Sequence, residues 1–200
     1  MSRVWGAAAL AMAAWLAPAA VRAQDGLPCL HPRTQQALPQ ILGPAFTRGR
    51  THGFEAQAPG FGCSVRYEHP SGMWADVYIY RAGLGVIDDV ERDPRLMDQF
   101  QGTMIAVEQK WKQQPGASVR DLQANYEKRG RHGVEVMVGS AFLEMTGRDA
   151  LRTHVQLWSG GGAIWKLRAT FPAKDLAVSD DAVRALAEAL VDLSREEGSL

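Results

Sequence analysis

The second half of the chain alternates strand-like segments with connectors that are too short to hold a helix. Four segments show the period-two alternation of β-strands, and they span residues 119–127, 134–145, 151–158 and 164–171. The connectors between them are rich in glycine, and a parallel crossover needs about a dozen residues. Neighbouring strands must therefore run antiparallel, and this half of the chain is predicted to form a meander.

Two further strands are predicted at residues 63–69 and 74–80, joined by the turn Pro70-Ser71-Gly72. The second of these strands is apolar on both sides. Its odd positions place Ala75, Val77 and Ile79 on one face, and its even positions place Trp74, Tyr78 and Tyr80 on the other. We therefore expect both faces of this strand to be covered.

Two helices are expected beside this sheet. An apolar stripe (Met97, Phe100, Met104, Val107, Trp111) predicts a helix from Asp93 or Pro94 to Lys112, and we expect Phe100, Met104 and Trp111 to be buried against the sheet. A second helix is predicted from Asp180 to Arg195, with Ser179 as its N-cap. The stripe of this second helix is Val183, Leu186, Leu190 and Leu193. The glycines and prolines between residues 24 and 62 indicate irregular structure, with a short helical turn around residues 34–42.

These elements define an α+β fold, namely an antiparallel sheet of about six strands covered by helices in an α/β/α sandwich. The apolar pattern aligns across the last hairpin if Leu157 pairs with Trp165 and Val155 with Leu167. No linker divides residues 24–200, so we expect a single domain there.

Several segments resemble the exported bacterial members of the PsbP-like α/β/α sandwich group. The resemblance covers most of residues 38–195. It is carried by the order of elements and by four segments, namely 38–48, Phe61-Gly62, Val77-Tyr78-Ile79-Tyr80 with its glycine-containing loop, and Trp165-Lys166-Leu167-Arg168 before a final helix. It implies an accessory or binding protein without catalysis, and it transfers no catalytic residue.

The first 23 residues resemble a secretory signal peptide. Arg3 provides a positive start, residues 4–21 form an apolar run without charge, and Pro18 breaks that run before a cleavage site after Ala23. An uncleaved membrane anchor is the alternative, because the run approaches the roughly 18 residues that span a bilayer. We predict a periplasmic or secreted protein with no membrane span after cleavage.

The chain contains two cysteines, Cys29 and Cys63, and both follow the predicted signal peptide. An even count in an exported chain indicates one disulfide, which would tie the irregular N-terminal segment to the first hairpin. A nucleophilic or redox cysteine is the alternative, although neither cysteine belongs to a C-x-x-C pair.

Several functional classes lack support in the sequence. The 22 basic and 22 acidic side chains balance, so no basic stretch predicts a nucleic-acid partner. The five histidines never lie two to five residues apart, and Gly139-Ser140 lacks the second glycine of a nucleophile elbow. We therefore predict no metal site, no cofactor and no catalytic motif.

Two sets of side chains are candidates for a binding site. In the expected register Arg152, His154, Lys166 and Arg168 share one side of the last hairpin, where they would attract a carboxylate, a phosphate or an acidic peptide. Alternatively, these cations pair with acids of a neighbouring helix, such as Glu108 or Glu188. Aromatic residues on the strands would form a platform for a flat ligand or a sugar, or would pack in the core; these are Trp74, Tyr78, Tyr80, Trp158 and Tyr67.

The functional prediction is an exported, periplasmic, non-enzymatic binding or accessory protein. Its partner would be an envelope protein or a small anionic ligand, and we expect a monomer. The alternative is a small periplasmic hydrolase or metal-dependent enzyme, whose site is assembled only by the fold.

Overall fold

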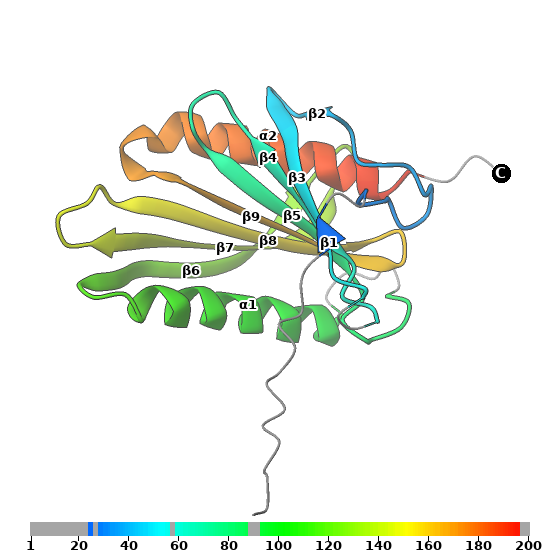
Figure 1. The fold of residues 1–200 in the computed structure, drawn as a ribbon, viewed down its shortest axis with the longest axis horizontal. Coiled ribbons are helices and arrows are strands. Elements are labelled where there is room, and N and C mark those ends of the chain that lie inside the picture. The colour runs from blue at the N-terminus through cyan, green and yellow to red at the C-terminus, as the bar shows by residue number, and fades with distance from the viewer. Residues whose placement is uncertain (1–23, 26–27, 57–58, 88–92, 197–200) are drawn as a thin grey trace, which may run out of the picture.

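One continuous antiparallel sheet forms the body of the protein (Figure 1). The computed structural model describes residues 24–25, 28–56, 59–87 and 93–196, so the predicted signal peptide lies outside the described residues. The nine strands follow the order β1-β3-β4-β5-β9-β8-β7-β6, and β2 also pairs with β3. They are β1 (Gln24–Asp25), β2 (Ile41–Leu42), β3 (Phe46–Gly53), β4 (Cys63–Glu68), β5 (Trp74–Tyr80), β6 (Ala117–Arg129), β7 (Val134–Met145), β8 (Leu151–Gly160) and β9 (Ala163–Pro172).

The prediction of about six strands was too low because the N-terminal segment adds three. Strand β3 pairs along β4, and its register shifts between Arg48 and Thr51. Gly49 lies within this irregularity, where a glycine is tolerated in a strand. The helical turn predicted around residues 34–42 was wrong, because a bridge between Leu30 and Ala37 and the strand β2 occupy that part of the chain.

Helix α1 (Pro94–Lys112) begins and ends where the sequence predicts. The carboxylate of Asp93 caps it by accepting a hydrogen bond from the backbone N–H of Arg95 at 2.8 Å. Phe100 and Met104 are buried as predicted, whereas Trp111 is half-buried and donates from its indole N–H to the carbonyl of Glu144. The helix connects β5 in the middle of the sheet to β6 at its edge.

Helix α2 (Leu176–Ser194) begins earlier than predicted. A 3-10 turn over Ala173–Asp175 leads directly from β9 into the helix, so Ser179 is a buried helical residue and not the N-cap. Nothing in the segment Leu176–Ser179 opposes helix formation, and the chain turns as soon as β9 ends. Val183, Leu186 and Leu190 are buried as predicted, and Leu193 is partly buried.

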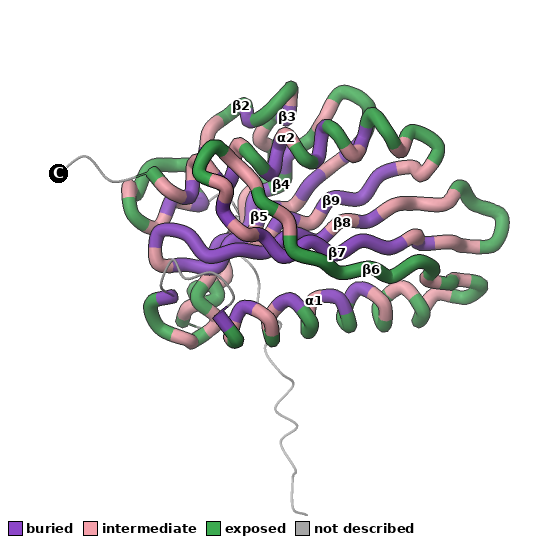
Figure 2. The backbone as a smooth tube through the Cα atoms, turned by 180° about the vertical axis from the view of Figure 1, so that it is seen from behind, coloured by how far each residue is buried: buried purple, intermediate pink, exposed green. Residues whose placement is uncertain are grey.

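The two helices lie on opposite faces of the sheet, as Figure 1 shows. Trp158 and Trp165 belong to the core beneath α2, while Leu157 and Ile164 belong to the core beneath α1. The strands hold more of the described residues than the two helices do, and one helix lies on each face of the sheet. The fold therefore matches the predicted α/β/α sandwich only in part. Figure 2 shows that β6, at the edge, is exposed along most of its length. No helix in the described part of the chain has the length and apolar character needed to span a membrane.

The predicted register of the last hairpin was wrong by one residue. Trp158 pairs with Trp165 and Leu157 pairs with Lys166. The reason is the turn: Gly161 and Gly162 have φ of 61° and 81°, so they form a two-residue connection that pairs Gly160 with Ala163. Such a turn requires positive φ at both positions, which glycine adopts without strain.

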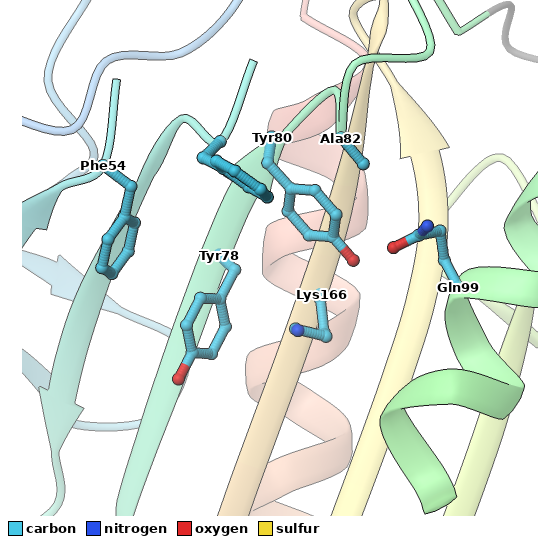
Figure 3. A pocket seen from close by; sticks show the side chains of 7 residues that line it. Phe54, Tyr78, Tyr80, Ala82, Gln99 and Lys166 are labelled. Atoms are coloured by element: carbon cyan, nitrogen blue, oxygen red, sulfur yellow. The ribbon is translucent and has the colours of Figure 1, made fainter. Parts of the chain in front are cut away.

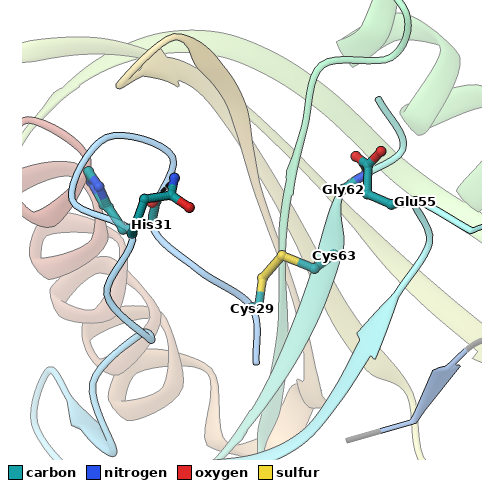
Figure 4. The surroundings of a disulfide bond; sticks show 6 residues. Cys29, His31, Glu55, Gly62 and Cys63 are labelled. Carbon is teal, nitrogen blue, oxygen red and sulfur yellow. Dashed lines mark hydrogen bonds between the residues drawn. A yellow bond between two sulfur atoms is a disulfide. The ribbon is translucent and has the colours of Figure 1, made fainter. Parts of the chain in front are cut away.

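The predicted disulfide is present. Cys29 and Cys63 are bonded, and their α-carbons are 5.5 Å apart (Figure 4). Close to the bond, the imidazole Nε2 of His31 lies 3.0 Å from the carbonyl oxygen of Leu193 at the end of α2. The segment around Cys29 is therefore held both to β4 and to α2.

Helix α1 packs mainly on β6, β7 and β8, so it covers only half of its face of the sheet. On β5, the side chains facing α2 (Ala75, Val77 and Ile79) are buried, as expected. The other side of β5 is only half-buried at Tyr78 and Tyr80. The expectation that both faces of this strand are covered therefore holds for the α2 side and only in part for the other side, which forms the wall of a groove.

Candidate functional site

A groove runs along the boundary between helix α1 and the uncovered strands of the sheet. One part of it is a cavity of about 310 Å³. Tyr78, Lys166 and Arg168 line this cavity from β5 and β9, and its polar lining from α1 includes Asp98, Gln99 and Lys110. A neighbouring cavity of about 340 Å³ shares part of this lining; its residues are Phe54, Phe61, Tyr78, Tyr80, Ala82, Gln99 and Lys166 (Figure 3).

Lys166 lies at the point where the two cavities meet. Its ammonium nitrogen is 4.5 Å from the centre of the Tyr78 ring and 5.2 Å from the centre of the Tyr80 ring. Both distances are typical of a cation held over an aromatic face. Within the described part of the chain, Lys166 forms no ion pair with a carboxylate. Its ammonium group is therefore held by the two rings and left open to the cavities.

The surroundings change the acid–base behaviour of this cluster. Burial, followed by repulsion from Arg168, lowers the pKa of Lys166 to about 8. Burial, followed by the neighbouring Tyr78, raises the pKa of Tyr80 to about 12, and burial also raises the pKa of Tyr78. At neutral pH both phenols are uncharged and Lys166 is largely protonated, so the cluster carries a positive charge.

Arg168 adds a second positive charge to the same cavity. It follows Lys166 by two residues, so both side chains lie on the same face of β9. Asp76 is opposite Arg168 on β5, but its carboxylate accepts two hydrogen bonds from Arg66, at 2.8 and 3.0 Å. Among the described residues, no carboxylate forms an ion pair with Arg168. The cavity is therefore lined by three cations, Lys110, Lys166 and Arg168, and by one acid, Asp98, and within the described residues neither Lys166 nor Arg168 forms an ion pair.

The other two cations predicted for this site lie on the opposite face of the sheet. The shifted register turns Arg152 and His154 toward α2, so the expected four-residue cluster does not exist. His154 lies 2.9 Å from a carboxylate oxygen of Asp180, and Arg152 donates to the hydroxyl of Ser140 at 2.7 Å. Both side chains therefore have internal partners, which lie on α2 for His154 and on β7 for Arg152.

The aromatic candidates also separate into two groups. Trp158 is 1% exposed and donates from its indole N–H to the hydroxyl of Ser194, and Tyr67 is fully buried. Tyr78 and Tyr80 line the groove. Phe54 and Phe61 also line it, although the sequence pattern did not single them out. They flank a loop within the segment predicted to be irregular, where no periodicity indicates the direction of a side chain.

The groove continues across the sheet toward its other edge. A third cavity, of about 490 Å³, lies over β3, β4 and β5. Its lining is polar and contains charges of both signs: Arg50, His52, Phe54, Ser64, Arg66, Glu68, Asp76 and Tyr78. Tyr78 borders all three cavities, so they form one surface.

The chain matches no protein-family model, and it matches no curated protein at a significant level. Among the described residues, no three His, Cys, Asp or Glu side chains converge as a metal site requires. The assignment of a function therefore depends on the groove itself.

Proposed function

We propose that this protein is an exported, non-enzymatic binding protein whose groove takes a ligand with an anionic group. The observation that carries the proposal is the pair Lys166 and Arg168, two cations that line one cavity without an internal carboxylate partner. The anion would lie between them, and the rings of Tyr78 and Tyr80 would contact the apolar part of the ligand.

The position of Lys166 supports a functional role over a structural one. Strand β9 lies in the middle of the sheet, between β5 and β8, where a partly buried ammonium costs free energy. Burial lowers the pKa of His154, which has a carboxylate oxygen of Asp180 2.9 Å away, whereas Lys166 has no carboxylate partner among the described residues. An external anion would supply the missing charge.

The proposed place of action is the periplasm or the extracellular space. The disulfide is compatible with an oxidising compartment, and residues 1–23 have the pattern of a signal peptide. The resemblance to the PsbP-like group agrees with an accessory or binding role. The alternative is a hydrolase or metal-dependent enzyme, and conversion of the bound ligand into a product would favour it.

The test is an NMR titration of residues 24–200 with phosphate, benzoate and galacturonate. We expect backbone shifts near Tyr78, Lys166 and Arg168 with at least one of these anions. Replacing both cations by alanine should weaken binding by about tenfold or more for each charge removed. The matched control is Lys174→Ala, which removes an exposed lysine outside the groove and should leave the titration unchanged.

Two results would overturn the proposal. One is the absence of shifts around the cavity with all three anions. The other is the same titration curve for the wild type and the double variant.

A further inference from the structure

Four side chains form one row across the uncovered half of the sheet. His52 on β3 pairs with Ser64 on β4, Ser64 pairs with Tyr78 on β5, and Tyr78 pairs with Lys166 on β9. Paired residues lie side by side and point to the same face of a sheet. Because adjacent strands are about 4.8 Å apart, the three steps of the row span about 14 Å. The surface therefore fits an elongated ligand that crosses the strands.

The two ends of this row differ in charge. At the Lys166 end, β9 supplies two cations, Lys166 and Arg168, and helix α1 adds Lys110 and one acid, Asp98. At the other end, Arg50 and Glu68 are exposed, and Arg66 and Asp76 form a fixed ion pair with two hydrogen bonds. This end offers hydrogen-bond donors and acceptors close together, and it favours neither an anionic nor a cationic ligand group. Such a surface suits the hydroxyl groups of an uncharged polar part of a ligand.

Aromatic rings accompany the row. Phe54 and Tyr78 border both the third cavity, which we call the distal cavity, and the 340 Å³ cavity at Lys166. Figure 3 shows the ring of Tyr78 between Phe54 and Lys166. Rings beside polar groups with fixed positions are suited to a sugar, because a sugar presents an apolar C–H face together with a rim of hydroxyls.

A peptide fits this surface less well. Extended peptides bind a sheet by adding to its edge, where unpaired N–H and C=O groups are available. The row crosses the face of β4, β5 and β9, which are paired on both sides, so their backbone groups are already used. Recognition here must come from side chains.

We propose that the ligand is an acidic oligosaccharide of two or more rings, with a carboxylate at Lys166 and Arg168 and further rings lying over Tyr78 toward β3. This inference rests on the proposed function, because the carboxylate is the anion that the cationic cavity takes. It adds the ligand class and the use of the distal cavity.

The experiment compares galacturonate with linear trigalacturonate by calorimetry. For the wild type we expect the trimer to bind about tenfold more tightly than the monomer, since the distal end adds hydrogen bonds to charged groups. The decisive variant is Arg50→Ala/Glu68→Ala, which removes one exposed charge of each sign and leaves the net charge unchanged. It should bind the monomer as the wild type does and lose the gain from the added rings.

Two controls complete the design. Arg184→Ala removes an exposed cation from α2, on the opposite face, and should retain the full gain with length. Triglutamate carries the same number of side-chain carboxylates on a peptide, and it should gain little from the distal residues.

The outcomes separate the two proposals. If the monomer binds at the Lys166 cavity and the trimer binds no more tightly, the oligosaccharide assignment is wrong and the anion site stands. If neither binds and the anions tested above also fail, the proposed function is wrong. If triglutamate shows the larger gain through Arg50 and Glu68, the ligand is an acidic peptide and the assignment to a sugar is overturned.

Discussion

Replacing Lys166 by methionine should make the folded protein more stable at pH 7. Methionine keeps the length of the stem between Tyr78 and Tyr80 and removes the charge. A substitution that strengthens the fold and removes binding identifies a side chain kept for function at a cost in stability.

The magnitude follows from the pKa of Lys166. A fall from 10.5 to about 8 corresponds to a cost of about 3 kcal/mol for keeping the ammonium charged in the folded state. The expected gain for Lys166→Met at pH 7 is therefore up to about 3 kcal/mol.

The same reasoning predicts how this difference changes with pH. Below about pH 8, Lys166 is charged in both the folded and the unfolded state, and the folded state carries the full cost. Between about pH 8 and 10.5 the folded state releases its proton while the unfolded state still holds it, so the wild type gains stability as the pH rises. The advantage of the variant should therefore shrink across this window.

The assay is urea unfolding of both proteins at pH 7, 9 and 10, because the difference between them isolates Lys166 from the other titrating groups. A variant that is less stable than the wild type at pH 7, or a difference that stays constant up to pH 10, would refute the argument. Either result would mean that Lys166 is a structural residue and not an open cation.

Three further predictions concern binding, the core and the disulfide. Affinity for galacturonate should fall by up to tenfold per pH unit above about pH 8, as the free protein loses the Lys166 proton, and calorimetry at pH 7 and 9 checks this. Phe100→Ala should lower the free energy of unfolding by about 3 to 5 kcal/mol. Ile105 on the same helix is 52% exposed, so Ile105→Ala should change that free energy by less than about 0.5 kcal/mol. Replacing Cys29 and Cys63 by alanine should cost about 3 to 4 kcal/mol, measured by thermal unfolding against the oxidised wild type.

The sequence was most informative where periodicity and short connectors acted together. The bounds of α1 follow from an apolar stripe closed by Pro115-Gly116, and those of β7 follow from an uninterrupted strand pattern. Strand β3 was missed because five of its eight residues, counting Thr47 to His52 without Gly49, have polar or charged side chains. Arg50 and His52 line the third cavity, so the polar residues on this side of the strand remove the apolar alternation that would have indicated it.

Only two of the four predicted site residues line the cavity, because a shift of one residue in the pairing of β8 with β9 moves the β8 side chains to the other face. Lys166 and Arg168 were proposed together and do line one cavity, but Arg152 and His154 belong to the other face. The apolar pattern favoured pairing Leu157 with Trp165, and it misled because both faces of β8 and β9 carry buried apolar residues. The two-glycine turn decided it, and its conformation depends on the φ angles of Gly161 and Gly162, which the strand pattern does not encode.

Helix α1 separates the stability of the fold from the chemistry of the groove. Its buried stripe includes Phe100 and Met104, which pack at Gly139, where an added Cβ would lie 2.5 Å from the Met104 sulfur. The groove is lined by a second stripe, one residue earlier along the helix, that includes Gln99 and Thr103. Because successive helical residues are about 100° apart, one stripe faces the sheet while the other faces the ligand cavity. Substitutions in the groove stripe should therefore alter which anion is preferred without loosening the contact at Gly139, whereas a larger residue at Gly139 would displace helix α1 and with it the helical wall of the groove.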